Sequence, residues 1–160
     1  MGFNIGVSGK IWDEDSNCDK ILDRMYFNWV KEYSLHGNQS CMIQTGNYFK
    51  LDLKPLTWLV YDPIWEPGEE WDDDDPRYDK HIQFGLQKTD FLLDLVSRLI
   101  KNVMTDSNFI DHINYKTDDD STLWRTYVLK GEFLEHLKTL KESLDCYKSH
   151  GQDEVYFYCG

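Results

Sequence analysis

A stripe of apolar side chains between residues 92 and 103 constrains the fold of this chain most strongly. Its members recur at the three- and four-residue spacing that places them on one side of an α-helix: Leu92, Leu95, Val96, Leu99, Ile100 and Val103. Thr89 stands where it can cap the first turn of this helix. A second stripe starts after Gly131 and ends before Gly151; it consists of Phe133, Leu134, Leu137, Leu140, Leu144 and Tyr147. We therefore expect two long amphipathic helices.

Shorter periods near the two ends of the chain indicate β-strands. In residues 3–11, and again in residues 154–159, the side chains alternate in character from one residue to the next, as they do in a strand with one buried face. Between these ends, apolar residues in 18–37 return at mostly three- and four-residue spacing, which predicts a further helix that ends near Gly37.

The middle of the chain is expected to add strands to the sheet. Gly46-Asn47 suits the positive φ angles of a tight hairpin turn, and 108–115 fits either a strand or a helix. The segments expected to be strands are 41–45 and 48–53, on either side of that turn, then 56–61 and 123–129. Runs of strands separated by helices are typical of the α+β class. We expect a mostly antiparallel sheet packed with about three helices, in a single domain over residues 1–160.

Composition sets the cellular setting that we expect. The 160 residues are 41% hydrophobic and 15% aromatic, which is too rich in core-forming side chains for a disordered chain. The apolar runs are shorter than the roughly 20 residues that span a bilayer, and the N-terminus lacks the pattern of a secretory signal. The four cysteines (Cys18, Cys41, Cys146 and Cys159) are dispersed singly, so we expect reduced thiols in a cytoplasmic protein without a membrane segment.

An acidic segment rich in Pro and Trp, at about 62–80, is the clearest functional signal. Nine acidic residues and one Arg lie between Asp62 and Asp79. So many like charges repel one another at a cost in stability, which favours a binding surface over a plain solvated loop. Tryptophan is a frequent anchor at interfaces, and carboxylates around it steer a basic partner. The predicted partner-binding residues are Trp65, Glu66, Glu69, Glu70, Trp71, Asp72, Asp73, Asp74 and Asp75.

The net charge of −12 predicts the kind of partner. It disfavours direct binding to nucleic acids and to anionic membranes, because both carry charge of the same sign. Our leading hypothesis is an acidic, non-enzymatic inhibitor that occludes the nucleic-acid-binding or active surface of a basic protein such as a nuclease. In size and charge the chain resembles small bacterial immunity proteins and phage-encoded inhibitors of host defence systems, although it matches no motif of either group.

Two other classes of function stay open at this point. One is an enzyme or small-molecule binder that uses a pocket between the sheet and the helices, lined by some of the many Tyr and Trp side chains. The other is a homo-oligomer in which the aromatic side chains form a subunit interface. The sequence fixes neither the partner nor the oligomeric state.

No motif identifies a reaction or a metal site. A helix-loop-helix calcium pattern that starts at Asp72 puts Arg77 where Gly is needed and Gln83 where Glu is needed. Glu132 with His136, and Cys146 with His150, have the spacing of neighbours on a helix but lack a third partner or a recognisable catalytic context. We therefore predict no catalytic residue, no metal and no cofactor.

Overall fold

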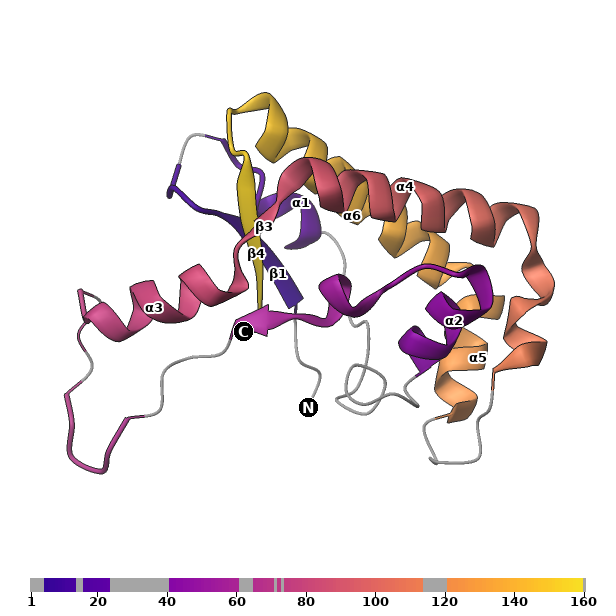
Figure 1. Ribbon diagram of the computed structural model, residues 1–160, viewed down its shortest axis with the longest axis horizontal. Helices are drawn as coiled ribbons and strands as arrows, with labels where there is room; N and C mark the ends of the chain where they lie inside the picture. The colour runs from indigo at the N-terminus through magenta and orange to yellow at the C-terminus, as the bar shows by residue number, and fades with distance from the viewer. Residues whose placement is uncertain are drawn as a thin grey trace.

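The computed structural model confirms the α+β class, with a small sheet beside two long helices (Figure 1). These helices are α4 (Thr89–Thr105) and α6 (Glu132–Ser149), and they pack against each other. Each buries the stripe that the sequence predicts, apart from Ile100 and Leu134, which are partly buried. Thr89 is the first residue of α4 rather than its cap, and its hydroxyl donates to the carbonyl of Gln152 at 2.7 Å. The structure describes residues 5–13, 16–23, 41–60, 65–70, 72, 74–113 and 121–159.

Strand β4 (Glu154–Cys159) is the centre of the sheet. Strand β1 (Ile5–Gly9) runs antiparallel along one side of it, with Ile5 opposite Cys159 and Gly9 opposite Val155. On the other side β4 pairs antiparallel with β3 (Gln87–Lys88) and parallel with β2 (Leu59–Val60). The sheet is mixed, with β2 as the parallel strand in a mostly antiparallel arrangement.

In the described part of the chain, one continuous core lies between the sheet and the helices. The alternation predicted for residues 154–159 is confirmed, because Val155 and Phe157 are almost fully buried between partly buried neighbours. In β1 it holds from Ile5 to Val7 only, since Ser8 is buried as well. Val7, Val155 and Phe157 belong to the same cluster as fully buried side chains of α4 and α6: Leu92, Leu99, Phe133, Leu137, Leu140 and Leu144. The prediction of one compact domain agrees with this continuous core.

The hairpin expected around Gly46 is wrong, because these residues form helix α2 (Cys41–Phe49). The helix ends in a Schellman arrangement, in which the amide of Leu51 donates to the Gly46 carbonyl at 2.8 Å and that of Lys50 to the Asn47 carbonyl at 3.2 Å. Lys50 has the left-handed φ of 56° that this ending requires. Glycine at position 46 is therefore explained by a close backbone contact at the end of α2 and not by a hairpin turn.

Residues 123–129 are likewise helical and lie in α5 (Ser121–Leu129). Trp124 is buried and Tyr127 and Val128 are partly buried, at the spacing of one helix face, whereas Arg125 is exposed. The aromatic and β-branched content of this segment favours a strand, but the three- and four-residue spacing of its buried side chains is that of a helix.

Three further expectations are corrected or narrowed. The strand expected at 56–61 is reduced to β2, because η2 (Lys54–Thr57) is a 3-10 helix. The ambiguous segment 108–115 is helical as far as η3 (Ser107–His112) extends. Helix α1 (Lys20–Asp23) is the described part of the helix expected over 18–37, and residues 24–40 lie outside the described ranges.

The expectation of reduced thiols is wrong for Cys18 and Cys146, which form a disulfide. The two cysteines are 128 residues apart, so only the fold brings them together, and their dispersal along the sequence hid the pair. Among the described residues, Cys41 stays outside the disulfide. None of the described helices is long and apolar enough to cross a membrane.

Candidate functional site

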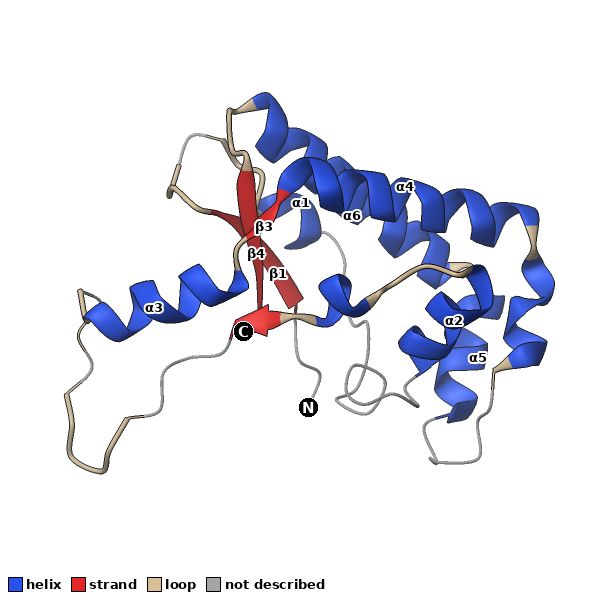
Figure 2. Cartoon of the chain, viewed as in Figure 1, coloured by secondary structure: helices blue, strands red, loops and turns tan. Residues whose placement is uncertain are grey.

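The acidic segment and the helix that follows it form a projection, which we call the acidic arm and define as the described residues from Trp65 to Gly85. Figure 1 shows helix α3 (Pro76–Gly85) leading away from the sheet and from α4 and α6, with the acidic loop beyond its N-terminal end. Figure 2 shows the same division into loop and helix. The loop is therefore shorter than predicted, because α3 already begins at Pro76.

Arg77 is the centre of the acidic arm. Its Nη2 lies 2.9 Å from Oδ2 of Asp75, and its Nη1 lies 3.1 Å from Oε2 of Glu69. The guanidinium carbon lies 3.9 Å from the centre of the Trp65 ring, the geometry of a cation–π contact. Trp65 also packs against Tyr78, with ring centres 5.9 Å apart. One arginine thus joins the start of the loop, its middle and the first turn of α3.

The carboxylates that Arg77 contacts also hold the backbone in place. Oδ1 of Asp75 accepts a hydrogen bond from the Arg77 amide at 2.8 Å and so caps the N-terminus of α3. Oε2 of Glu69 accepts a hydrogen bond from the Glu66 amide at 2.7 Å. These hydrogen bonds keep both groups ionised: the Arg77 side chain holds the pKa of Asp75 below its usual value, and the Glu66 amide, then Arg77, lowers the pKa of Glu69.

The predicted site residues therefore divide into two groups. Trp65, Glu69 and Asp75 support the acidic arm from within. The outward carboxylates, as we call the exposed remainder, belong to Glu66, Glu70, Asp72 and Asp74. Trp71 and Asp73 lie outside the described residues, so their part in the site stays a prediction.

The structure adds two residues that the sequence analysis did not include in the site. Arg77 was counted only as the single positive charge of the segment, although Asp75 followed by Pro76 is a recognisable helix start that would have placed it in the first turn of α3. Phe84, on the same helix, is 77% exposed. The acidic arm thus presents a large apolar ring as well as its carboxylates.

A hydrogen-bonded pair of polar side chains, the partly buried Tyr127 and the buried His136, joins α5 to α6. The Tyr127 hydroxyl lies 2.6 Å from Nδ1 of His136, beside the rings of Trp124 and Phe133. Burial raises the pKa of Tyr127 and lowers that of His136, so both stay neutral. Glu132 is exposed while His136 faces the core, so the possible metal pair of Glu132 and His136 is replaced by a hydrogen bond that belongs to helix packing.

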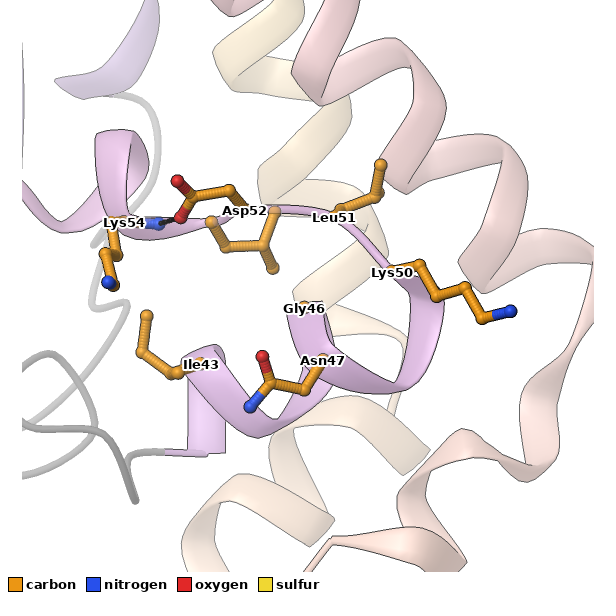
Figure 3. A pocket seen from close by; sticks show the side chains of 8 residues that line it. Ile43, Gly46, Asn47, Lys50, Leu51, Asp52 and Lys54 are labelled. Atoms are coloured by element: carbon orange, nitrogen blue, oxygen red, sulfur yellow. Dashed lines mark hydrogen bonds between the residues drawn. The ribbon is translucent and has the colours of Figure 1, made fainter.

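An open pocket of about 350 Å³ lies at the C-terminal end of α2 (Figure 3). It is lined by Ile43, Gly46, Asn47, Lys50, Leu51, Asp52, Leu53 and Lys54. Figure 3 shows the Lys50 side chain extending away from the opening, and Asp52 accepts a hydrogen bond from the Lys54 amide at 3.1 Å. The pocket lies between α2 and the segment that follows it, and not between the sheet and the helices, where the small-molecule hypothesis expects one.

Comparison of the chain with protein-family models, with curated proteins and with solved structures gives no match.

Proposed function

We propose that this chain is an acidic binding protein that neutralises a basic protein partner by covering its nucleic-acid-binding or active surface. The observation that carries the proposal is the acidic arm: a projecting segment whose internal contacts use two carboxylates and whose outward carboxylates remain exposed. A nuclease or another nucleic-acid-handling protein has the complementary surface, because it binds a row of phosphates.

The arm supplies both parts of such an interaction. Exposed charges act over about 8 Å at physiological ionic strength, so the outward carboxylates accelerate the encounter with a basic surface. Charge alone gives little affinity at short range, where desolvation of the carboxylates opposes binding. The exposed ring of Phe84 provides apolar contact on the same arm. The contacts of Arg77 with Glu69, Asp75 and Trp65 keep the acidic arm in one arrangement before binding. This reduces the conformational entropy lost on association.

The test starts by capturing the partner from a lysate with the full chain and identifying it by mass spectrometry. Association with the captured protein is then measured at about 50 mM and about 300 mM salt, a range over which screening of exposed charges becomes much stronger. The arm variant neutralises the outward carboxylates by Glu66→Gln, Glu70→Gln, Asp72→Asn and Asp74→Asn. Asparagine at position 72 keeps an oxygen that can accept the hydrogen bond from the Asp74 amide.

A matched control changes the net charge equally, but on other elements. It carries Asp94→Asn, Asp111→Asn, Glu142→Gln and Asp145→Asn, which are exposed acidic residues outside the acidic arm. We expect the arm variant to associate about tenfold more slowly and with a weaker salt dependence, while the control associates at nearly the original rate. Equal rates and equal salt dependence for the arm variant and the original chain would contradict the proposal.

Phe84→Ala separates short-range contact from steering. If the ring is an anchor, we expect dissociation to be faster by a factor of about 30, which corresponds to a hot spot of about 2 kcal/mol, with little change in association. An unchanged dissociation rate would remove Phe84 from the interface.

A further inference from the structure

Two cysteines and a histidine meet where the N-terminal segment crosses the last turn of α6. Cys18 is fully buried and is joined to Cys146 of α6 by the disulfide. His150 follows directly after α6, and its Nδ1 lies 3.7 Å from Sγ of Cys18 and 3.9 Å from Sγ of Cys146. Within the described part of the chain, these are the residues whose donor atoms come close enough together to hold a metal ion.

The two nitrogen–sulfur distances are close to those between the ligands of a tetrahedral zinc ion. Zinc binds thiolate at about 2.3 Å and imidazole nitrogen at about 2.0–2.1 Å, which places sulfur and nitrogen ligands about 3.5 Å apart and two sulfurs about 3.8 Å apart. The two nitrogen–sulfur distances here, 3.7 and 3.9 Å, are already close to that value. Only the two sulfurs are too close, and reduction of the disulfide removes that constraint.

The junction is also held by contacts that do not depend on the disulfide. The Ser143 hydroxyl of α6 donates to the Cys18 carbonyl at 3.2 Å, and this bond is buried. Helix α1, which starts two residues after Cys18, packs against α6 as well. Breaking the sulfur–sulfur bond therefore leaves Cys18 beside Cys146, so that the three donor groups stay together in the reduced protein.

We propose that in the reduced protein Cys18, Cys146 and His150 bind a zinc ion, so that a disulfide and a metal are alternative cross-links at one junction. This proposal is independent of the proposed function of the acidic arm. His150 is exposed, so water can reach the metal and fill the fourth position of the tetrahedron.

A phosphine or thiol reductant supplies two electrons and is itself oxidised, and two protons are taken up as the disulfide becomes two thiols. Zinc then displaces both thiol protons. In the disulfide form, Nδ1 of His150 lies 2.9 Å from the carbonyl oxygen of Cys146 and donates to it. Metal binding through Nδ1 requires the tautomer with its proton on Nε2, so this hydrogen bond is given up.

The experiment is a cobalt(II) titration of the full chain, reduced with a phosphine and kept free of oxygen. Cobalt occupies the same tetrahedral geometry as zinc and reports thiolate ligands by a charge-transfer band in the near ultraviolet. We expect one cobalt ion per reduced chain, displaced by zinc, and none bound at this site in the oxidised chain. A reduced chain without the thiolate band would overturn the proposal.

Variants assign the ligands. Cys146→Ser removes one thiolate, and we expect loss of the band. His150→Ala removes an exposed ring and leaves the disulfide intact, so its folding can be verified in the oxidised form before reduction; we expect metal affinity to fall by more than about tenfold. Cys41→Ser is the control and should bind cobalt like the original chain. If His150→Ala retains full affinity, or if Cys41→Ser loses the band, the assignment is wrong.

Discussion

Replacement of Gly46 by alanine tests the structure of α2 most directly, because helix propensity and the structure predict opposite signs. Alanine is favoured over glycine inside a helix by about 1 kcal/mol. In this fold, however, a Cβ on Gly46 would lie 2.6 Å from the carbonyl oxygen of Leu51 and 2.9 Å from Cγ of Leu53. Both distances are shorter than normal van der Waals contact, and the first involves backbone that forms the end of α2.

The size of the effect follows from these two opposing contributions. Relief of the contact requires the segment after Lys50 to move away from α2, which loosens the hydrogen bond from the Leu51 amide to the Gly46 carbonyl. Such overpacking typically costs about 1–3 kcal/mol, and a clash with backbone belongs at the upper end of that range. After the gain in helix propensity, we expect Gly46→Ala to lower the free energy of unfolding by about 2 kcal/mol.

Asn47→Ala is the matched control on the same helix. Asn47 is exposed, so alanine should be neutral or should raise the free energy of unfolding by up to about 0.5 kcal/mol. Urea denaturation followed by circular dichroism measures both variants, provided that the slope against urea stays unchanged. A Gly46→Ala protein as stable as the original, or a clear loss of stability in Asn47→Ala, would contradict the helical description of this segment and favour a hairpin.

Three further predictions concern other parts of the fold. Because burial lowers the pKa of His136 in the folded protein, the unfolded chain binds that proton more readily; the contribution of His136 to stability should be complete above about pH 6.5 and decrease as pH falls toward the folded-state pKa. Urea denaturation at several pH values should show that the free energy of unfolding falls less below pH ~6.5 for His136→Gln than for the original chain. Arg77→Gln makes the acidic arm more negative but removes the ion pairs with Glu69 and Asp75, so affinity for the captured partner should fall. Higher affinity of this variant would mean that negative charge alone is sufficient for binding. Leu99 is fully buried, and Leu99→Ala should cost about 3 kcal/mol of unfolding free energy, whereas Met104→Ala, at a side chain that is 61% exposed, should cost less than about 0.5 kcal/mol.

The parts of the fold that the sequence predicted correctly are those in which one periodic pattern acts alone. Helices α4 and α6 bury continuous stripes, and the alternation around Val7 and Phe157 corresponds to β1 and β4. The predictions failed where two signals competed. The Gly46-Asn47 pair suits a hairpin turn, whereas in the fold Gly46 is required by the close approach of the Leu51 carbonyl just after the end of α2. In α5, strand-like composition concealed the helical spacing of Trp124 and Tyr127.

The candidate site was predictable in its charge but not in its internal order. Composition located the acidic segment, but it gave no means of distinguishing Glu69, whose carboxylate pairs with Arg77, from its neighbour Glu70. That distinction depends on where α3 begins, because the helix start sets the position of Arg77. The junction of Cys18 with His150 was hidden for a different reason: its residues are separated by almost the whole chain and meet only in the folded state.

The central position of β4 determines the order in which this protein can fold as it is synthesised. Strand β1 leaves the ribosome first, whereas every strand pairing in the described sheet involves β4. At typical rates of translation, β1 waits on the order of 10 s before residues 154–159 exist. During that time the apolar side chains of Ile5 and Val7 lack the strand that pairs with β1 in the finished fold. The described sheet therefore cannot assemble until β4 has been made, and until then the apolar face of β1 is a site for non-native contacts.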